Sequence, residues 1–153
     1  MITRRDAVVA VTAVCVTMAA VTLADSVAKP IMRSSVFNWA NIKAESTKYG
    51  ARRQVFDART ATLNGLECHV TTLNPGEVPH AGHQHLEEEL IIIKEGTLEA
   101  MQNGVTNRAG PGAVIFEASN ELHGLRNPGP TAATYYVIKF SPGTLKDKGV
   151  LPK

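Results

Sequence analysis

From residue 52 onward, the sequence consists of short runs that are apolar or alternate between apolar and polar residues, and turn-forming residues separate these runs. Short runs of this kind predict β-strands, and no long stretch shows the periodicity of an amphipathic helix. The predicted strands are 53–56, 66–73, 89–94, 97–102, 113–117 and 134–140, with breaks at 64–65, 74–76, 95–96, 103–104, 110–112 and 127–130. The pattern therefore indicates an all-β barrel or sandwich.

The alternation also predicts which side chains point into the barrel, since neighbouring residues on a strand face opposite sides. The last predicted strand has two such sets, Tyr136, Ile138 and Phe140 on one face and Tyr135, Val137 and Lys139 on the other. We expect the first set to line the barrel. Residues 90–93 are apolar on both faces, which suits a strand covered on both sides by an N-terminal arm or by a second subunit. A homodimer is therefore expected.

Length and composition limit the classes of protein that need to be considered. The chain has 153 residues, which suits one domain with a sizeable core. Its formal net charge is +2 and its basic residues form no long cluster, so a nucleic-acid partner is not expected. Of the two cysteines, Cys15 lies in an apolar N-terminal stretch, and Cys68 lies in a predicted strand between Leu66 and Val70. Cys68 is therefore predicted to be a buried core residue without a disulfide partner.

The N-terminal segment 1–24 has the pattern of an export signal. Arg4 and Arg5 precede the stretch 7–24, which carries no charge and ends in the small residue Ala24. A basic end, an apolar middle and a small-residue exit are typical of a signal peptide, and the paired arginines resemble a twin-arginine signal. Cleavage after Ala24 would give a periplasmic or secreted protein. The stretch also approaches the length of a membrane span, so an uncleaved membrane anchor is the alternative.

The rest of the chain divides into an N-terminal segment and a barrel. Residues 25–50 form the predicted linker and N-terminal arm, in which Pro30 disfavours a helix. Phe37 and Trp39 stand two residues apart, which suits a short strand or an extended arm that packs on the barrel. Residues 51–153 form the predicted barrel domain.

Three histidines and a glutamate have spacings that suit one metal ion. His83, His85 and Glu89 are separated by even numbers of residues, so their side chains point to the same side if the segment is extended. A further imidazole, His123, follows 38 residues after His85. Imidazole and carboxylate groups together suit one divalent transition metal, namely Fe, Mn, Ni, Co, Cu or Zn.

The first of these segments resembles the first sequence motif of the cupin superfamily. His83, His85, Glu89 and Gly96 have the separations that the motif requires. The leading glycine of the motif is displaced by one position, because six residues instead of five separate Gly76 from His83.

The second segment resembles the second cupin motif. Gly112, His123 and Asn127 have the required separations. Ala118 replaces a proline of the motif, and Asn120 replaces a glycine. Asparagine tolerates a positive φ better than most residues, so we still expect a turn at this position.

The resemblance covers roughly residues 60–141 and implies both the fold and the site. It implies a cupin double-stranded β-helix, which is a jelly-roll barrel, here with an N-terminal arm. It also implies one divalent ion bound by His83, His85, Glu89 and His123. An octahedral ion with these four ligands keeps open positions for water, a substrate oxygen or dioxygen.

The sequence also gives expectations for other polar residues near the motifs. Glu87 is too close to His85 for the family spacing and is expected in a solvated acidic turn. His80 is either a fifth ligand or, as we prefer, a loop histidine at the mouth of the site. His69 is expected to face solvent or the rim. Arg126 is expected to be a solvated surface residue, and pairing with an anionic substrate is its alternative role.

Cupins include dioxygenases, decarboxylases, isomerases and proteins that only bind a ligand, and the fold does not choose among them. We expect an exported metal-dependent enzyme, a dioxygenase or related oxidoreductase, whose partner is a small oxygenated organic molecule. The sequence assigns no catalytic residue beyond the metal ligands. The alternative is a cupin that binds a sugar or another small ligand without turnover. Contact with a membrane is expected only if segment 1–24 stays uncleaved.

Overall fold

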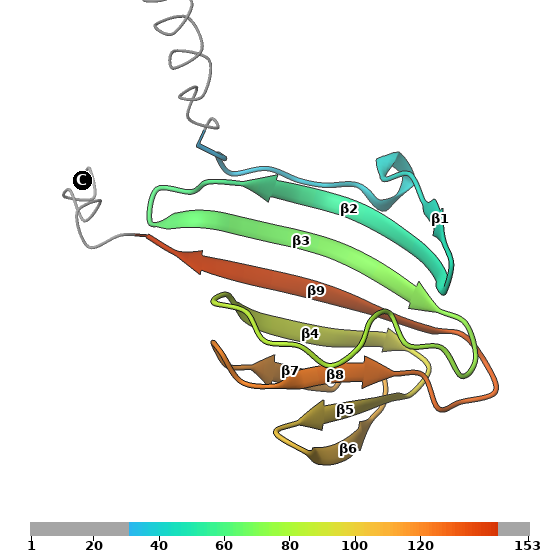
Figure 1. Ribbon diagram of the computed structural model, residues 1–153. Helices are drawn as coiled ribbons and strands as arrows, with labels where there is room; N and C mark the ends of the chain where they lie inside the picture. The colour runs from blue at the N-terminus through green and yellow to red at the C-terminus, as the bar shows by residue number, and fades with distance from the viewer. Residues whose placement is uncertain (1–30, 144–153) are drawn as a thin grey trace, which may run out of the picture.

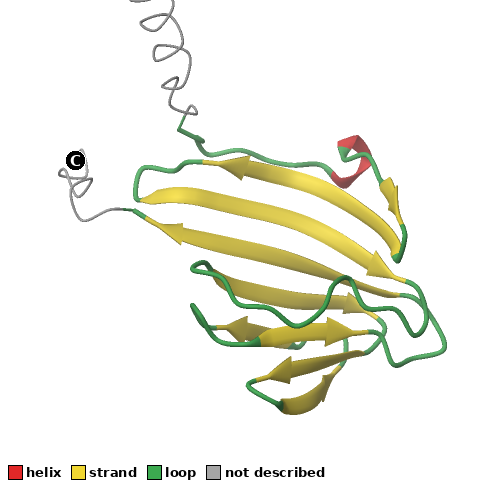
Figure 2. Cartoon of the chain, viewed as in Figure 1, coloured by secondary structure: helices red, strands yellow, loops and turns green. Residues whose placement is uncertain are grey.

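The computed structural model describes residues 31–143, which form two antiparallel β-sheets and one short 3₁₀ helix (Figures 1 and 2). The elements are η1 (Trp39–Asn41), β1 (Glu45–Thr47), β2 (Gly50–Ala58), β3 (Leu63–Leu73), β4 (Glu88–Glu95), β5 (Leu98–Gln102), β6 (Val105–Ala109), β7 (Val114–Glu117), β8 (His123–Arg126) and β9 (Ala133–Pro142). The larger sheet has the strand order β1-β2-β3-β9-β4-β7, and the smaller has the order β6-β5-β8. The all-β prediction is confirmed.

All six predicted strands are present, and several are longer than predicted. β2 occupies Gly50–Ala58 instead of 53–56, and β3 begins at Leu63. Asn64 and Gly65 therefore lie inside β3, where we expected a break. The register between β3 and β9 shifts between Leu63 and Gly65, so this turn-forming pair disturbs the ladder without reversing the chain.

The pattern of apolar residues did not predict the short polar strands. The edge strand β6 is exposed along most of its length, so it has no alternation to detect. Asn103 and Gly104, with φ of 48° and 87°, form the tight turn that joins β5 to β6. β8 occupies a segment in which we predicted no strand, and its residues His123 and Gly124 are buried.

The glycine of the first cupin motif is required by its surroundings. Gly96 follows β4 with a φ of 79°, in the left-handed region that favours glycine. A Cβ atom at this position would lie 2.7 Å from the Cα atom of Ala133. Both constraints exclude a larger side chain from this turn.

The inner face of the larger sheet changes from apolar to polar along its strands, and this change positions the site. The apolar core lies between the two sheets and consists of Leu73, Ile91, Ile93, Leu98, Ala100, Ile115, Ala133, Tyr135 and Val137. Further along the same strands, the residues that continue the inner face are polar. They are Glu67, His69, Glu89, Glu117 and Lys139. The barrel therefore has an apolar end and a polar end.

β9 faces the core with the opposite set of residues from the one predicted. Tyr135 and Val137 are buried in the core, whereas Tyr136 and Ile138 are half-buried on the outer face. The alternation could not distinguish the two faces because both are covered and both carry apolar side chains. Lys139 belongs to the inner set, where a carboxylate pairs with it.

The N-terminal arm packs on the outer face of the larger sheet, as predicted. The ring of Phe37 lies 5.1 Å from that of Phe56 on β2. Trp39 lies under two cations, with its ring centroid 4.6 Å from Arg53 Cζ and 5.0 Å from Lys94 Nζ. Because these cations come from β2 and β4, the indole covers the strands between them, β3 and β9.

The outer face of β4 and β7 carries an exposed apolar patch. Leu90 pairs with Phe116 and Ile92 pairs with Val114 across the two strands. Phe116 and Val114 are 51% and 60% exposed. This patch is where a second subunit would contact the sheet, and the homodimer stays a prediction.

Cys68 is the free cysteine of the described chain, and it is buried as predicted. Burial and the nearby carboxylate of Glu67 raise the pKa of its thiol to about 11. The thiol is therefore protonated at neutral pH and has no reactive character.

The predicted export signal 1–24 lies outside the described residues. Within residues 31–143, no helix is long and apolar enough to cross a membrane.

Candidate metal centre

The loop between β3 and β4, residues 74–87, carries two of the predicted metal ligands, and a buried asparagine fixes its start. Asn127 is fully buried, and its Nδ2 donates hydrogen bonds to the carbonyl oxygens of Leu73, Asn74 and Thr131 at 3.0, 3.1 and 2.8 Å. The asparagine of the second cupin motif is therefore a structural residue that attaches this loop beside β8.

Backbone pairing then lays the loop along β8. His83 and His123 exchange reciprocal backbone hydrogen bonds of 3.0 Å each. The backbone N–H of Asn120 donates to the carbonyl oxygen of His85 at 2.8 Å. Asn120 has a φ of 59°, so asparagine does adopt the turn geometry of the motif's glycine. These bonds place all three histidines at one end of the barrel.

The three imidazole rings converge on one point. His83, His85 and His123 each offer a nitrogen within 4.8 Å of those of the other two. Their ring centroids lie 4.7–5.1 Å apart. A group of this size and composition can hold one metal ion.

Two of the rings are held in one tautomer by backbone carbonyls. The Nδ1 atoms of His85 and His123 donate to the carbonyl oxygens of Glu87 and Glu121, at 3.0 and 2.8 Å. A carbonyl can only accept, so the lone pair of each ring is on Nε2, as in metal sites where an outer partner orients the ligand. His123 Nε2 and His83 Nδ1 are buried and have no hydrogen-bond partner within the described chain. A cation at the centre of the group would satisfy His123 Nε2.

Glu89 lies beside this group at a distance that fits a shared cation. Its Oε1 is 3.0 Å from Nε2 of His85. Since Nδ1 of His85 carries that ring's proton, these two atoms are both acceptors, and a proton or a metal ion must lie between them. Two ligands at right angles on an ion with bonds of about 2.1 Å would be about 3.0 Å apart. The donor set therefore fits one divalent ion.

A row of charged side chains crosses the inner face of the larger sheet at the level of Glu89. Glu67, Lys139, Glu89 and Glu117 face one another in register on β3, β9, β4 and β7. Nζ of Lys139 lies 2.8 Å from Oε1 of Glu89. The single cation of this row therefore pairs with the carboxylate that lies beside the histidines.

Burial shifts the pKa of two groups at the site. Burial, followed by the charges of His80, His123 and His85, lowers the pKa of His83, which favours the neutral imidazole that metals bind. Burial raises the pKa of Glu117, against the hydrogen bond that Nε2 of Gln102 donates to it at 2.9 Å.

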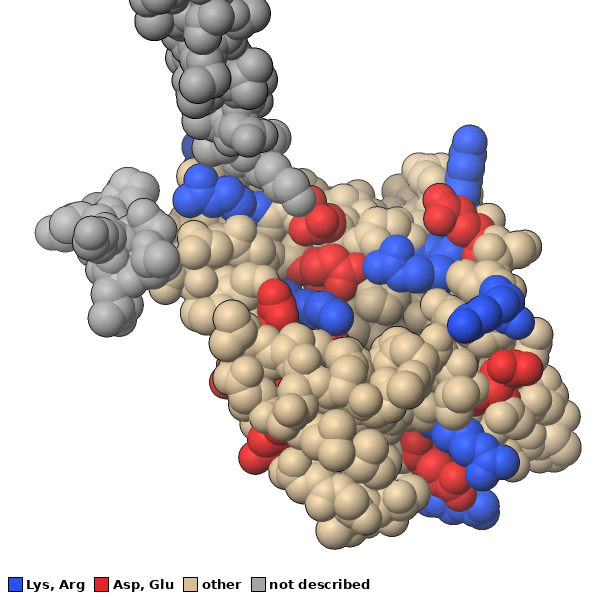
Figure 3. All heavy atoms as spheres, viewed as in Figure 1, with Lys and Arg blue, Asp and Glu red and all other residues tan. Residues whose placement is uncertain are grey.

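The histidines open onto a cavity of about 210 Å³ at the polar end of the barrel. His83 and His123 line it from the β3–β4 loop and from β8, whereas Arg52, His69, Lys139 and Glu89 line it from β2, β3, β9 and β4 of the larger sheet. On the face seen in Figure 3, charged groups of both signs gather around a hollow over these strands.

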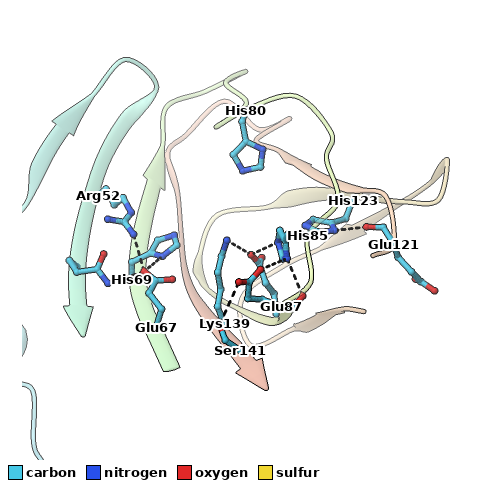
Figure 4. A network of polar contacts seen from close by, with 12 residues as sticks. Arg52, Glu67, His69, His80, His85, Glu87, Glu121, His123, Lys139 and Ser141 are labelled. Atoms are coloured by element: carbon cyan, nitrogen blue, oxygen red, sulfur yellow. Dashed lines mark hydrogen bonds and ion pairs between the residues drawn. The ribbon is translucent and has the colours of Figure 1, made fainter. Parts of the chain in front are cut away.

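The structure corrects the expectation for His69 and reveals a polar cluster that the motifs do not indicate. The side chain of His69 is only 14% exposed, and its Nδ1 lies 2.8 Å from Oε1 of Glu67. The same oxygen accepts hydrogen bonds from Arg52 at 2.9 Å and from Gln54 at 2.8 Å. Burial acts to raise the pKa of Glu67, but His69, Gln54 and Arg52 together lower it below its usual value. These residues form one connected cluster (Figure 4).

Two other predicted residues lie at the edge of the site or away from it. His80 is exposed and its ring contacts that of His83 edge-on at 4.2 Å, which is the mouth position we preferred. Arg126 is 55% exposed, and its guanidinium lies 3.6 Å from a carboxylate oxygen of Glu99. It lines a separate surface groove with residues such as Met101 and does not line the metal-site cavity.

Comparison with known proteins agrees with this architecture. The cupin domain family model matches residues 69–139. A cupin of the RmlC-like type from Shewanella frigidimarina is 19% identical over 74% of this chain and 96% of its own, with a TM-score of 0.57. KdgF from a Halomonas species is 21% identical over 74% and 98%, with a TM-score of 0.59. A predicted oxalate decarboxylase from Thermotoga maritima is 20% identical over 70% and 99%, with a TM-score of 0.57. No curated protein matches the sequence.

A jelly-roll barrel whose two motifs bring three histidines to one cavity defines a cupin with a potential metal site. The chain belongs to the cupin superfamily. The structural neighbours are too distant in sequence to transfer an activity, so they support the fold alone.

We predict that replacing His83 and His85 together with alanine abolishes stoichiometric metal binding, because only one imidazole of the group would remain. Elemental analysis of protein purified without an affinity tag measures this. His69→Gln is the matched control, since His69 lines the same cavity from the opposite wall and should leave a full equivalent of metal. A double variant that keeps a full equivalent would disprove the assignment.

Proposed function

We propose that this protein is a metal-dependent enzyme that acts on a small oxygenated organic molecule. The observation that carries the proposal is that His83, His123 and Glu89 themselves form part of the cavity wall. An ion bound by them and by His85 would be accessible from the cavity. A structural metal site is normally closed by its protein ligands, whereas a working site keeps positions open.

A dioxygenase or related oxidoreductase is the reaction class we propose first. A mixed set of imidazoles and one carboxylate suits iron or manganese and is related to the ligand sets of non-haem oxygenases. When bound, such an ion supplies Lewis-acid polarisation of a substrate oxygen and one-electron chemistry toward dioxygen.

The residues of this chain would contribute orientation and proton transfer. Lys139 holds the carboxylate of Glu89 in place. His69, fixed through Nδ1 by Glu67, keeps Nε2 for exchanging a proton with a molecule in the cavity. The core residues Ile91 and Val137 line the same cavity and exclude water from its inner end.

The open position predicts a response to an exogenous ligand. Nitric oxide added to the iron-loaded protein, or azide added to the cobalt-loaded protein, should change the metal's absorption spectrum. The variant with both His83 and His85 replaced by alanine should show no change, because it holds no ion. An unchanged spectrum with metal still bound would indicate a closed structural site and contradict the proposal. Oxygen uptake over a substrate panel then separates an oxidoreductase from a protein that binds a sugar or other ligand without turnover.

We also propose that the protein is exported and that residues 1–24 are removed. The support is the sequence pattern of Arg4, Arg5 and the uncharged stretch that ends at Ala24. Intact-mass measurement of the protein from its native host should find a chain that begins at Asp25. A full-length chain in the membrane fraction would favour the uncleaved anchor.

A further inference from the structure

The wall of the cavity opposite the histidines is rich in positive charge. The charged side chains that line the cavity are Arg52 and Lys139, which are cationic, and Glu89, which is the only carboxylate among the lining residues of the described chain. The metal ion, if bound as proposed, would add two more positive charges. Glu67 and Glu117 lie behind this wall and do not line the cavity.

Arg52 is held from behind by one carboxylate oxygen. One of its terminal nitrogens donates to Oε1 of Glu67 at 2.9 Å, and the same oxygen also accepts from His69 and Gln54. A guanidinium carries five N–H donors in a planar fork. The bond to Glu67 uses one of them, and the side chain is 34% exposed, so part of the fork is available to a molecule in the cavity. The shared oxygen neutralises Arg52 only in part and fixes its orientation.

Lys139 places a second cation next to the metal site. Its ammonium contacts Glu89 at 2.8 Å, and the same Glu89 oxygen lies 3.0 Å from Nε2 of His85. An ammonium has three donors, so the contact with Glu89 leaves others for a ligand. Arg52 and Lys139 thus mark two ends of one cationic wall that faces the histidines.

We propose that the cavity takes a small organic carboxylate, whose anionic group lies against Arg52 and Lys139 while another oxygen of the molecule reaches the metal. This inference rests on the proposed function and names its substrate class. The cavity is smaller than the 300 Å³ or more that is usual for drug-sized ligands, so the acid must be small. A neutral sugar would leave the charge of the bound ion and the remaining donors of Arg52 and Lys139 without an anionic partner in a partly desolvated site, which is unfavourable.

Arginine is suited to this recognition because its fork matches a carboxylate with two parallel hydrogen bonds. Hydrogen bonds that involve charged groups contribute more than neutral ones, and losing one changes affinity by about tenfold or more. The contribution of Arg52 can therefore be measured from binding alone, without knowledge of the reaction.

The experiment measures dissociation constants by isothermal titration calorimetry on the metal-loaded full chain. The probes are two matched pairs, glycolate with glycolamide and 3-hydroxypropanoate with its amide. The members of each pair differ in charge while each keeps a hydroxyl group for the metal. We expect the acid of at least one pair to bind at least about tenfold more tightly than its amide.

Variants assign this preference to the wall. Arg52→Gln should weaken binding of the acid about tenfold and leave the amide unchanged, whereas Arg52→Lys, which keeps the charge but loses the fork, should retain only part of the preference. Arg126→Gln removes the same formal charge from the separate groove and should behave as the unmodified chain. Thermal unfolding and metal content of each variant, compared with the unmodified chain, exclude misfolding as the cause.

Several results would overturn the inference. These are equal binding of acids and amides, an acid preference that survives Arg52→Gln, no binding of either acid at millimolar concentration, or tighter binding of inorganic phosphate than of both acids. If nitric oxide or azide still reaches the metal in such a case, the proposed function stands and only the substrate class is wrong. If neither reaches it, the proposed function itself has failed.

Discussion

The reciprocal backbone hydrogen bonds between His83 and His123 determine the geometry of the site. They join a loop that has little regular structure of its own to β8, and Asn127 fixes the beginning of that loop with two side-chain hydrogen bonds, to the carbonyl oxygens of Leu73 and Asn74. The imidazoles of the two cupin motifs can meet only because this pairing holds. Burial and the charges of the neighbouring histidines lower the pKa of His83, so the convergence of the rings favours its neutral imidazole.

A second constraint acts across the sheet. The inner faces of β3, β9, β4 and β7 are apolar at one end and charged at the other, so the barrel packs a core and a polar site within the same layer. Lys139 pairs with the carboxylate beside the histidines and lies in register with Glu67, which orients both His69 and Arg52. The metal site and the cationic wall share one cavity.

The sequence predicted the fold class, the main strands and the grouping of three histidines, because strand alternation and motif spacing are local properties. It assigned the wrong face of β9 to the barrel, because Tyr136 and Ile138 are as apolar as Tyr135 and Val137 and both faces are covered. The roles of His69 and Lys139 depend on which strands are neighbours in the sheet. β3, β9 and β4 are adjacent in space but far apart in sequence, so no spacing pattern could have brought these side chains together.

X-ray absorption spectroscopy at the metal edge can show whether the three histidines form a metal centre that is open to the cavity, because it reports the type, number and distance of the ligands. We expect one ion per chain with three imidazole nitrogens at about 2.0–2.2 Å and oxygen ligands that include exchangeable water. A four-coordinate ion with protein ligands only, or an ion without imidazole ligands, would contradict this expectation.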